Sequence, residues 1–142
     1  EVGGWDWARW SCPAVSEMPD IADGITDWIL EVTEWAPETE IDATTVPVGE
    51  GLVRVEATVR NHGRLPTQIT ERGNETVQDE DPVVAVNGAE IVSGKPRQTI
   101  DHLGARGDGT HLEWVLEGAD TVEITLTGSR GISTQTTVEL SE

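Results

Sequence analysis

The chain has 142 residues, which is the usual length of a single folded domain. Its 27 acidic and 9 basic residues give a formal charge of -18. Such a negative field repels phosphate backbones and anionic lipids, and it disfavours a nucleic-acid or membrane-surface role. Cys12 is the single cysteine and cannot form a disulfide within the chain. No segment reaches the roughly 20 apolar residues of a membrane-spanning helix.

Other features of the composition are typical of proteins adapted to high salt. Lys95 is the only lysine among the nine basic residues, and Phe and Tyr are absent. At molar salt the Debye length falls to about 3 Å, so adjacent carboxylates such as those of residues 79–81 repel one another much less than in dilute buffer. We therefore interpret the acidic clusters as the solvated surface of a protein from a high-salt organism.

This interpretation predicts that stability depends on ionic strength. The melting temperature should be higher in molar KCl than in dilute buffer, because salt screens the repulsion between carboxylates. Thermal melts followed by circular dichroism at the two salt concentrations measure the difference. Equal melting temperatures would contradict the salt-adapted interpretation.

The first predicted element is an amphipathic helix. Five of the six tryptophans precede residue 37, and apolar residues recur on one helical face at positions 21, 25, 28, 29, 32 and 35. Pro19 suits a first helical turn and Pro37 cannot continue a helix, so we predict the helix over 19–35. The apolar face of this helix must pack against something.

From residue 38 onward apolar and polar residues alternate, which is typical of strands with one buried face. The pattern is seen at 53–60, 112–117, 121–126 and 132–140, and short runs rich in Val and Ile at 83–86 and 90–92 also indicate strands. Asn87-Gly88 predicts a β-hairpin between two of these strands. Trp114 has the same parity as its apolar neighbours, so we expect it in the core and not on a carbohydrate-binding platform. Seven or eight short strands predict a mainly β fold, an antiparallel immunoglobulin-like β-sandwich preceded by one amphipathic α-helix.

Familiar catalytic motifs are absent from the sequence. It has no Gly-x-Ser-x-Gly elbow, no phosphate-binding loop and no His-Glu-x-x-His pair. The glycine-rich loop 104–109 could hold a cation between Asp101, Asp108 and a carbonyl, but it lacks the alternating carboxylates of a calcium loop. A loop that connects strands is the simpler interpretation. We assign no metal and no cofactor to this chain.

Three stretches carry a resemblance to a known family. They are Glu1-Val2-Gly3-Gly4-Trp5 with the helix that ends before Pro37, residues 51–67, and Asp101-His102-Leu103-Gly104. Together they resemble the C-terminal region of haloarchaeal zinc metallocarboxypeptidase-like proteins. The last stretch is similar to a Gly-His-Leu-x-Gly sequence of that family and departs from it at Asp101 and Ala105. Val59, Asn61 and Gly63 resemble a strand end and turn of immunoglobulin-like modules, in which Asn and Gly favour left-handed backbone.

The resemblance implies that two regions of the chain have different roles. Residues 1–37 would be the tail of a carboxypeptidase catalytic domain, and residues 38–142 would be an accessory sandwich. Zinc and peptide hydrolysis would belong to the upstream catalytic domain, with Glu1 near the glutamate that acts as general base on zinc-bound water in the intact parent. Glu1 follows no initiator Met, so we expect a fragment or processed product. We assign it no cellular compartment.

The function implied is therefore that of a noncatalytic accessory domain, with no activity from this chain alone. The side chains expected to contact the catalytic domain are those of Ile25, Trp28, Ile29 and Trp35. Without that domain, an exposed apolar face would favour self-association. The alternative is a free-standing sandwich that binds a peptide or glycan through an edge strand or its glycine-rich loop.

Overall fold

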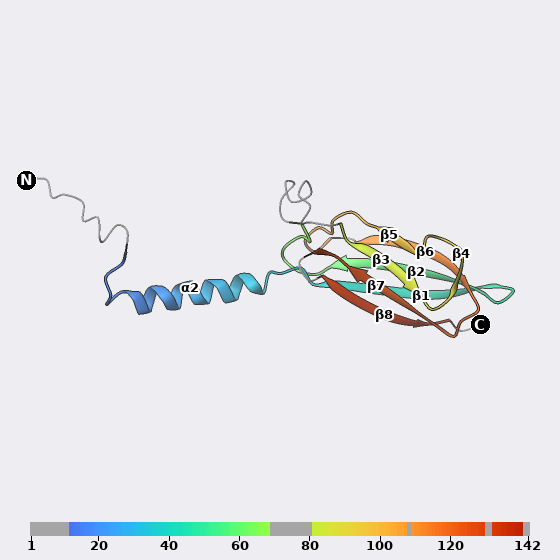
Figure 1. Ribbon diagram of the computed structural model, residues 1–142, viewed down its shortest axis with the longest axis horizontal. Coiled ribbons are helices and arrows are strands. Elements are labelled where there is room, and N and C mark those ends of the chain that lie inside the picture. The colour runs from blue at the N-terminus through green and yellow to red at the C-terminus, as the bar shows by residue number, and fades with distance from the viewer. Residues whose placement is uncertain (1–11, 69–80, 108, 130–131, 141–142) are drawn as a thin grey trace, which may run out of the picture. The chain divides into compact units, whose positions relative to one another are not determined.

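The computed structural model describes residues 12–68, 81–107, 109–129 and 132–140 (Figure 1). The chain divides into two compact units, Glu1–Trp35 and Ala36–Glu142. Helix α2 (Met18–Thr33) lies in the first unit, and all the strands described lie in the second. The predicted boundary, after residue 37, lies slightly further along the chain.

Helix α2 covers most of the predicted range 19–35. Pro19 occupies the first turn, where a missing N–H is harmless, and Asp20 places a negative charge at the positive end of the helix dipole. The helix ends with the N–H of Glu34 donating to the carbonyl of Leu30. No residue of α2 is buried. In the described part of the chain, no helix is long and apolar enough to cross a membrane.

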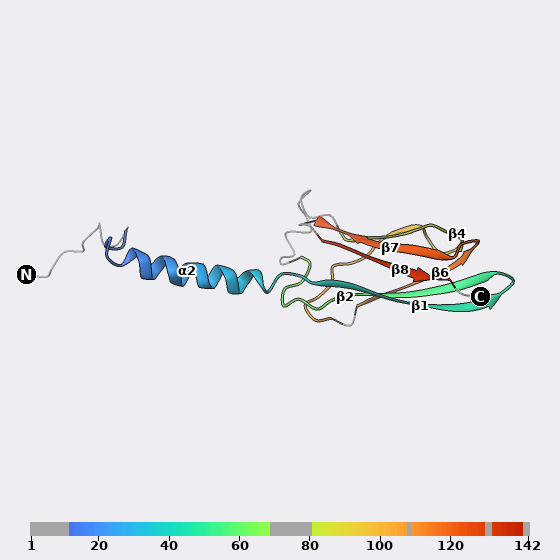
Figure 2. The same cartoon turned by 90° about the horizontal axis from the view of Figure 1, so that it is seen from below.

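In the described ranges, eight strands form two four-stranded sheets. They are β1 (Thr39–Gly49), β2 (Leu52–Asn61), β3 (Val83–Asn87), β4 (Glu90–Ser93), β5 (Arg97–Thr99), β6 (Thr110–Glu117), β7 (Thr121–Thr127) and β8 (Ser133–Glu139). The first sheet has the order β1-β2-β6-β4 and the second the order β5-β3-β7-β8, with every pairing antiparallel. Figure 2 shows them as two layers. The predicted immunoglobulin-like sandwich preceded by one helix is confirmed.

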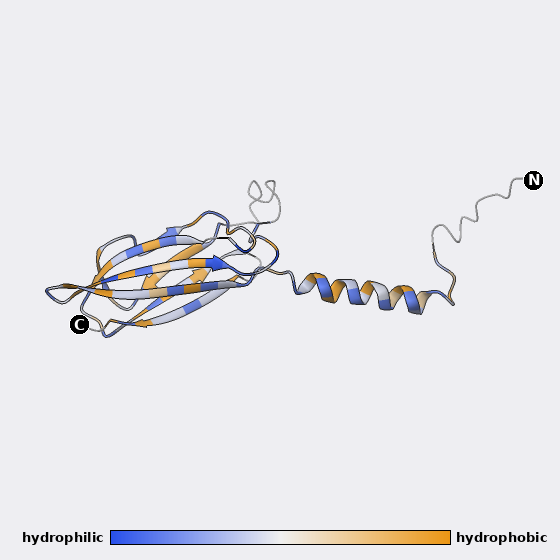
Figure 3. Cartoon of the chain, turned by 180° about the vertical axis from the view of Figure 1, so that it is seen from behind, coloured by the Kyte–Doolittle hydropathy of each residue, from blue (hydrophilic) through white to orange (hydrophobic). Residues whose placement is uncertain are grey.

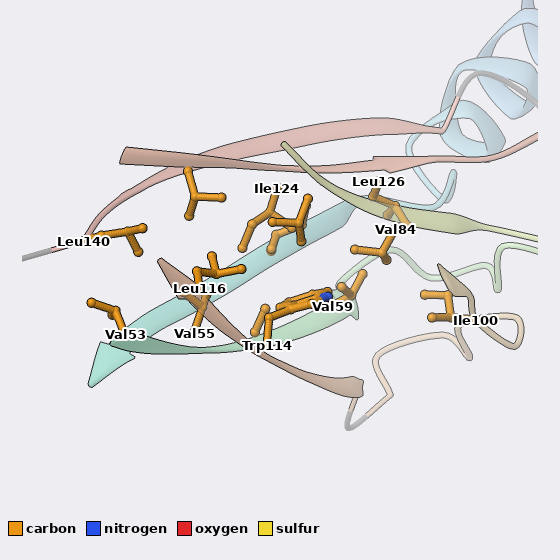
Figure 4. Close-up of a cluster of buried hydrophobic side chains, with 14 of the residues drawn as sticks. Val53, Val55, Val59, Val84, Ile100, Trp114, Leu116, Ile124, Leu126 and Leu140 are labelled. Atoms are coloured by element: carbon orange, nitrogen blue, oxygen red, sulfur yellow. The ribbon is translucent and has the colours of Figure 1, made fainter. Parts of the chain in front are cut away.

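The core lies between the two sheets and follows the predicted alternation. Figure 3 shows apolar and polar residues interleaved along the strands, and Figure 4 shows the buried side chains of both sheets meeting. Trp114 is 1% exposed, and its indole N–H donates to the carbonyl oxygen of Lys95 at 2.8 Å. The prediction that Trp114 packs in the core is therefore confirmed.

The predicted hairpin at Asn87-Gly88 is wrong. Strand β3 pairs with β5 and β7, whereas β4 pairs with β6 in the other sheet, so this connection crosses between the sheets. A two-residue type I′ turn needs positive φ at both central residues. Only Gly88 has it, at 102°, and Asn87 does not.

Candidate functional site

The most distinctive surface of the described chain is the apolar face of α2, which we define as Met18, Ile21, Ile25, Trp28 and Ile29. Trp28 is 62% exposed, Ile25 53% and Ile29 49%. Their spacing of three and four residues places them side by side along the helix. The structure thus gathers three of the four predicted contact residues on this face. Trp35, the fourth, is half-buried in the turn that follows the helix.

The residues of α2 outside the apolar face contribute little to the stability of the helix. The sequence has no basic residue between Arg9 and Arg54, and the pairs Asp23/Asp27 and Asp27/Glu31 bring like charges together one turn apart. Gly24, in the helix interior, costs about 1 kcal/mol relative to alanine. Glu17 makes no side-chain capping hydrogen bond, and the last turn carries no basic residue. Helices of this length are marginal in water without tertiary packing, so a contact on its apolar face would stabilise α2.

A shallow polar depression lies on the outer face of the first sheet. Its volume is about 580 Å³, and it is lined by Asp42, Thr44, Glu56, Ala57, Thr58, His111, Leu112 and Glu113. Thr58 Oγ1 lies 2.9 Å from His111 Nδ1, and Arg54 Nε lies 3.5 Å from Glu113 Oε1. The first contact is a hydrogen bond and the second an ion pair; both are exposed, and exposed ion pairs contribute little to stability. The arrangement is that of a solvated polar sheet face.

A second depression, of about 460 Å³, lies at the end of β2 and is lined by Arg60, His62, Arg106 and Gly107. His62 Nε2 is 2.6 Å from Glu40 Oε2, and Arg60 Nη1 is 3.3 Å from Asp42 Oδ2. Arg60 and His62 therefore face acids on β1, which offset the charge on this side of the depression.

Asn61, between Arg60 and His62, organises this end of the sandwich. It is 1% exposed. Its Oδ1 accepts the N–H groups of Glu38 at 3.0 Å and Gly63 at 2.9 Å. Its Nδ2 donates to the carbonyls of Leu65 at 2.8 Å and Gly104 at 3.3 Å. One amide side chain thus joins the start of β1, the turn after β2 and the glycine-rich loop.

The turn-geometry explanation for Asn61 and Gly63 is wrong, because neither has positive φ. Gly63 is required for a different reason: a Cβ at this position would collide with the backbone of Ala36, Pro37 and Glu38. The pattern of residues 59–63 is therefore explained by a buried hydrogen-bond centre and a close backbone approach.

Two predicted chemical positions lie outside the described residues. Glu1, the proposed general base of the parent, and Asp108, a candidate cation ligand, are both in this category. Within the described ranges, no group of three or more His, Cys, Asp or Glu residues could hold a metal ion. The start of the glycine-rich loop is hydrogen-bonded to the sandwich, since the N–H of Leu103, just before the loop, donates to Thr67 Oγ1 at 2.8 Å.

Comparison with known proteins gives a family but no activity. No curated protein matches the sequence. One similar solved structure is the GAE domain of GGA2p from Saccharomyces cerevisiae, with 12% identity, a TM-score of 0.32, and coverage of 72% of this chain and 86% of that chain. A family model described as a domain of unknown function, DUF8731, matches residues 39–139, from the first residue of β1 to the last of β8. Since this match covers well over half of the chain, the protein belongs to the DUF8731 family.

Proposed function

We propose that the chain is a noncatalytic accessory region of a larger protein, in which α2 docks the DUF8731 sandwich onto a partner domain. The observation that carries the proposal is the exposed apolar face of α2. Burying a large apolar side chain contributes roughly 1.5–3 kcal/mol, so five such residues represent a substantial unused stabilisation. Contiguous exposed apolar surface of this kind is typical of protein interaction sites.

The resemblance to zinc metallocarboxypeptidase-like proteins suggests which partner to test. The partner would be the catalytic domain of the same protein, and zinc and the peptide-hydrolysing chemistry would lie there. In this proposal, Glu1 would serve as general base only in the intact parent. The sandwich would shape substrate access or add solubility, as its strongly acidic composition favours in a high-salt organism.

Replacing Trp28 with alanine tests the proposed contact. Loss of the indole from a packed interface should weaken binding to the catalytic domain at least about 10-fold, because large aromatic side chains dominate such contacts. Binding is measured by pulldown and by calorimetric titration in molar KCl.

The matched control is Leu30→Ala. Leu30 is 59% exposed on the same helix but lies away from the apolar face, so its truncation should leave the affinity unchanged. An unchanged affinity for Trp28→Ala would eliminate the proposed contact.

A second candidate function, peptide or glycan binding by the sandwich, is favoured by the polar depression beside His111 on the first sheet. Edge strand β1 could also accept an extended peptide, although Pro47 and the register shift between Pro47 and Gly49 interrupt that edge. Peptide and glycan arrays probed with the full chain in high salt distinguish the two candidates. The accessory role predicts no autonomous affinity.

A further inference from the structure

The apolar residues of α2 follow a heptad repeat as well as a helical face. Within the helix, Met18, Ile21, Ile25, Trp28 and Val32 follow one another at intervals of three, four, three and four residues. Intervals of this kind occupy positions a and d of a coiled coil, which face a second helix along a single seam. In this register Met18, Ile25 and Val32 are at a, and Trp28 is at d.

The acidic residues of α2 are placed so that they do not oppose pairing with an identical helix. Asp20, Asp27 and Glu34 fall at position c, and Asp23 at f, on the side away from the seam. Only two acids, Glu17 and Glu31, fall at position g. In a parallel pair this position faces position e of the other helix. The e positions within α2 are occupied by uncharged residues, Ala22 and Ile29. A parallel pair therefore contains no like-charge contact across the seam.

The orientation of such a pair follows from the same register. In an antiparallel pair the g positions of the two helices face each other, which would bring Glu17 or Glu31 of one helix against an acid of its partner. The distribution of charge therefore favours the parallel arrangement.

We propose that the chain, without its partner domain, forms a parallel dimer in which α2 pairs with α2 of a second copy through the a and d positions. This pairing goes beyond the proposed docking role of α2 but uses the same apolar face. The two contacts are therefore mutually exclusive, and binding of the partner domain should dissociate the dimer.

The test compares two substitutions that have the same chemistry on opposite sides of one helix. Ile25→Asp places a carboxylate in the seam, whereas Leu30→Asp places it at position f; the two wild-type side chains are 53% and 59% exposed. Sedimentation equilibrium of the full chain in molar KCl, up to about 100 µM, gives the dimer dissociation constant. We expect a dimer for the wild type and for Leu30→Asp, and a dissociation constant raised at least about 100-fold for Ile25→Asp.

Two further measurements make the result specific to α2. The helical circular dichroism of the wild type should rise with concentration and that of Ile25→Asp should not, because α2 is marginal without a partner. Cys12 is a free, exposed thiol shortly before α2. A thiol-specific bifunctional crosslinker should join the Cys12 side chains of a parallel pair, and Cys12→Ser should abolish that product.

Each outcome decides between the inference and the proposed function. A wild-type chain that is monomeric throughout this range, or that loses dimers equally with Leu30→Asp, overturns the inference. If that monomer still binds the catalytic domain through Trp28, the proposed function stands. A dimer whose affinity for the catalytic domain is unaffected by Trp28→Ala supports the inference and eliminates the proposed docking contact.

Discussion

Replacing Trp114 with alanine is expected to lower the free energy of unfolding by about 3–5 kcal/mol, the range for truncating a large buried aromatic side chain. Trp114 is 1% exposed at the centre of β6, where it pairs with Val55 of β2. Its indole also packs on Gly94, where an added Cβ would lie only 2.6 Å from Trp114 Cδ1. Truncation would leave a cavity that this rigid surround cannot fill. Guanidinium unfolding in high salt, followed by circular dichroism, measures the loss.

Two variants separate packing from other causes. Trp28→Ala removes the same side chain at a position that is 62% exposed, and it should change the unfolding free energy of the sandwich by no more than about 0.5 kcal/mol. Trp114→Phe keeps a ring in the core but removes the N–H donor to Lys95, so an intermediate loss of about 1–3 kcal/mol is expected. A Trp114→Ala protein as stable as Trp28→Ala would show that the indole does not fill the core as described.

The strands that the sequence predicts well are those whose burial alternates strongly. Strand β2 buries Val53, Val55, Ala57 and Val59 on one face, and β7 buries its apolar residues in the same way. Period-two patterns of this strength identify a strand without any knowledge of its neighbours. The helix is equally predictable from the sequence, because Pro19 and Pro37 lie at the two ends of a clear apolar stripe.

Strand β1 was not predicted, because its alternation of apolar and polar residues is weak. It lies at a sheet edge, only Ile41 among its residues is buried, and Pro47 suggests a break. The hairpin at Asn87-Gly88 failed for a different reason. Whether the chain stays in one sheet or crosses to the other is decided by the pairing of β3 with β7 and of β4 with β6, which no local turn signal contains.

The candidate site, too, has features that the sequence predicts and features that it does not. The apolar face of α2 follows directly from residue spacing, and its heptad register can be read from the sequence. Its exposure was expected through the resemblance to a larger protein and not from the residue spacing itself, and the structure shows it. The role of Asn61 was hidden, because two of its partners are the amide of Glu38 and the carbonyl of Gly104, which are 23 and 43 residues away.

Asn61→Ala is expected to be the most damaging single substitution of a polar side chain in the described sandwich, with a loss of at least about 3 kcal/mol. It would leave the N–H groups of Glu38 and Gly63 and the carbonyls of Leu65 and Gly104 without this partner. Each buried polar group left unsatisfied costs about 1–3 kcal/mol. The hydrogen bonds join three segments, so the loss should loosen the start of β1, the turn after β2 and the glycine-rich loop together.

Asn61→Asp refines this expectation, because a carboxylate keeps an acceptor for Glu38 and Gly63 but replaces the Nδ2 donor with an oxygen that faces two carbonyls. A loss close to that of alanine would show that the donor side of the amide matters most, since carboxylate and carbonyl oxygens repel each other. Asn87→Ala, at an exposed asparagine, is the matched control and should change stability by no more than about 0.5 kcal/mol. Guanidinium unfolding gives the totals, and hydrogen exchange of the Gly63 amide reports local opening. If Asn61→Ala matched the Asn87 control and left Gly63 protected, the side chain would not hold these segments together.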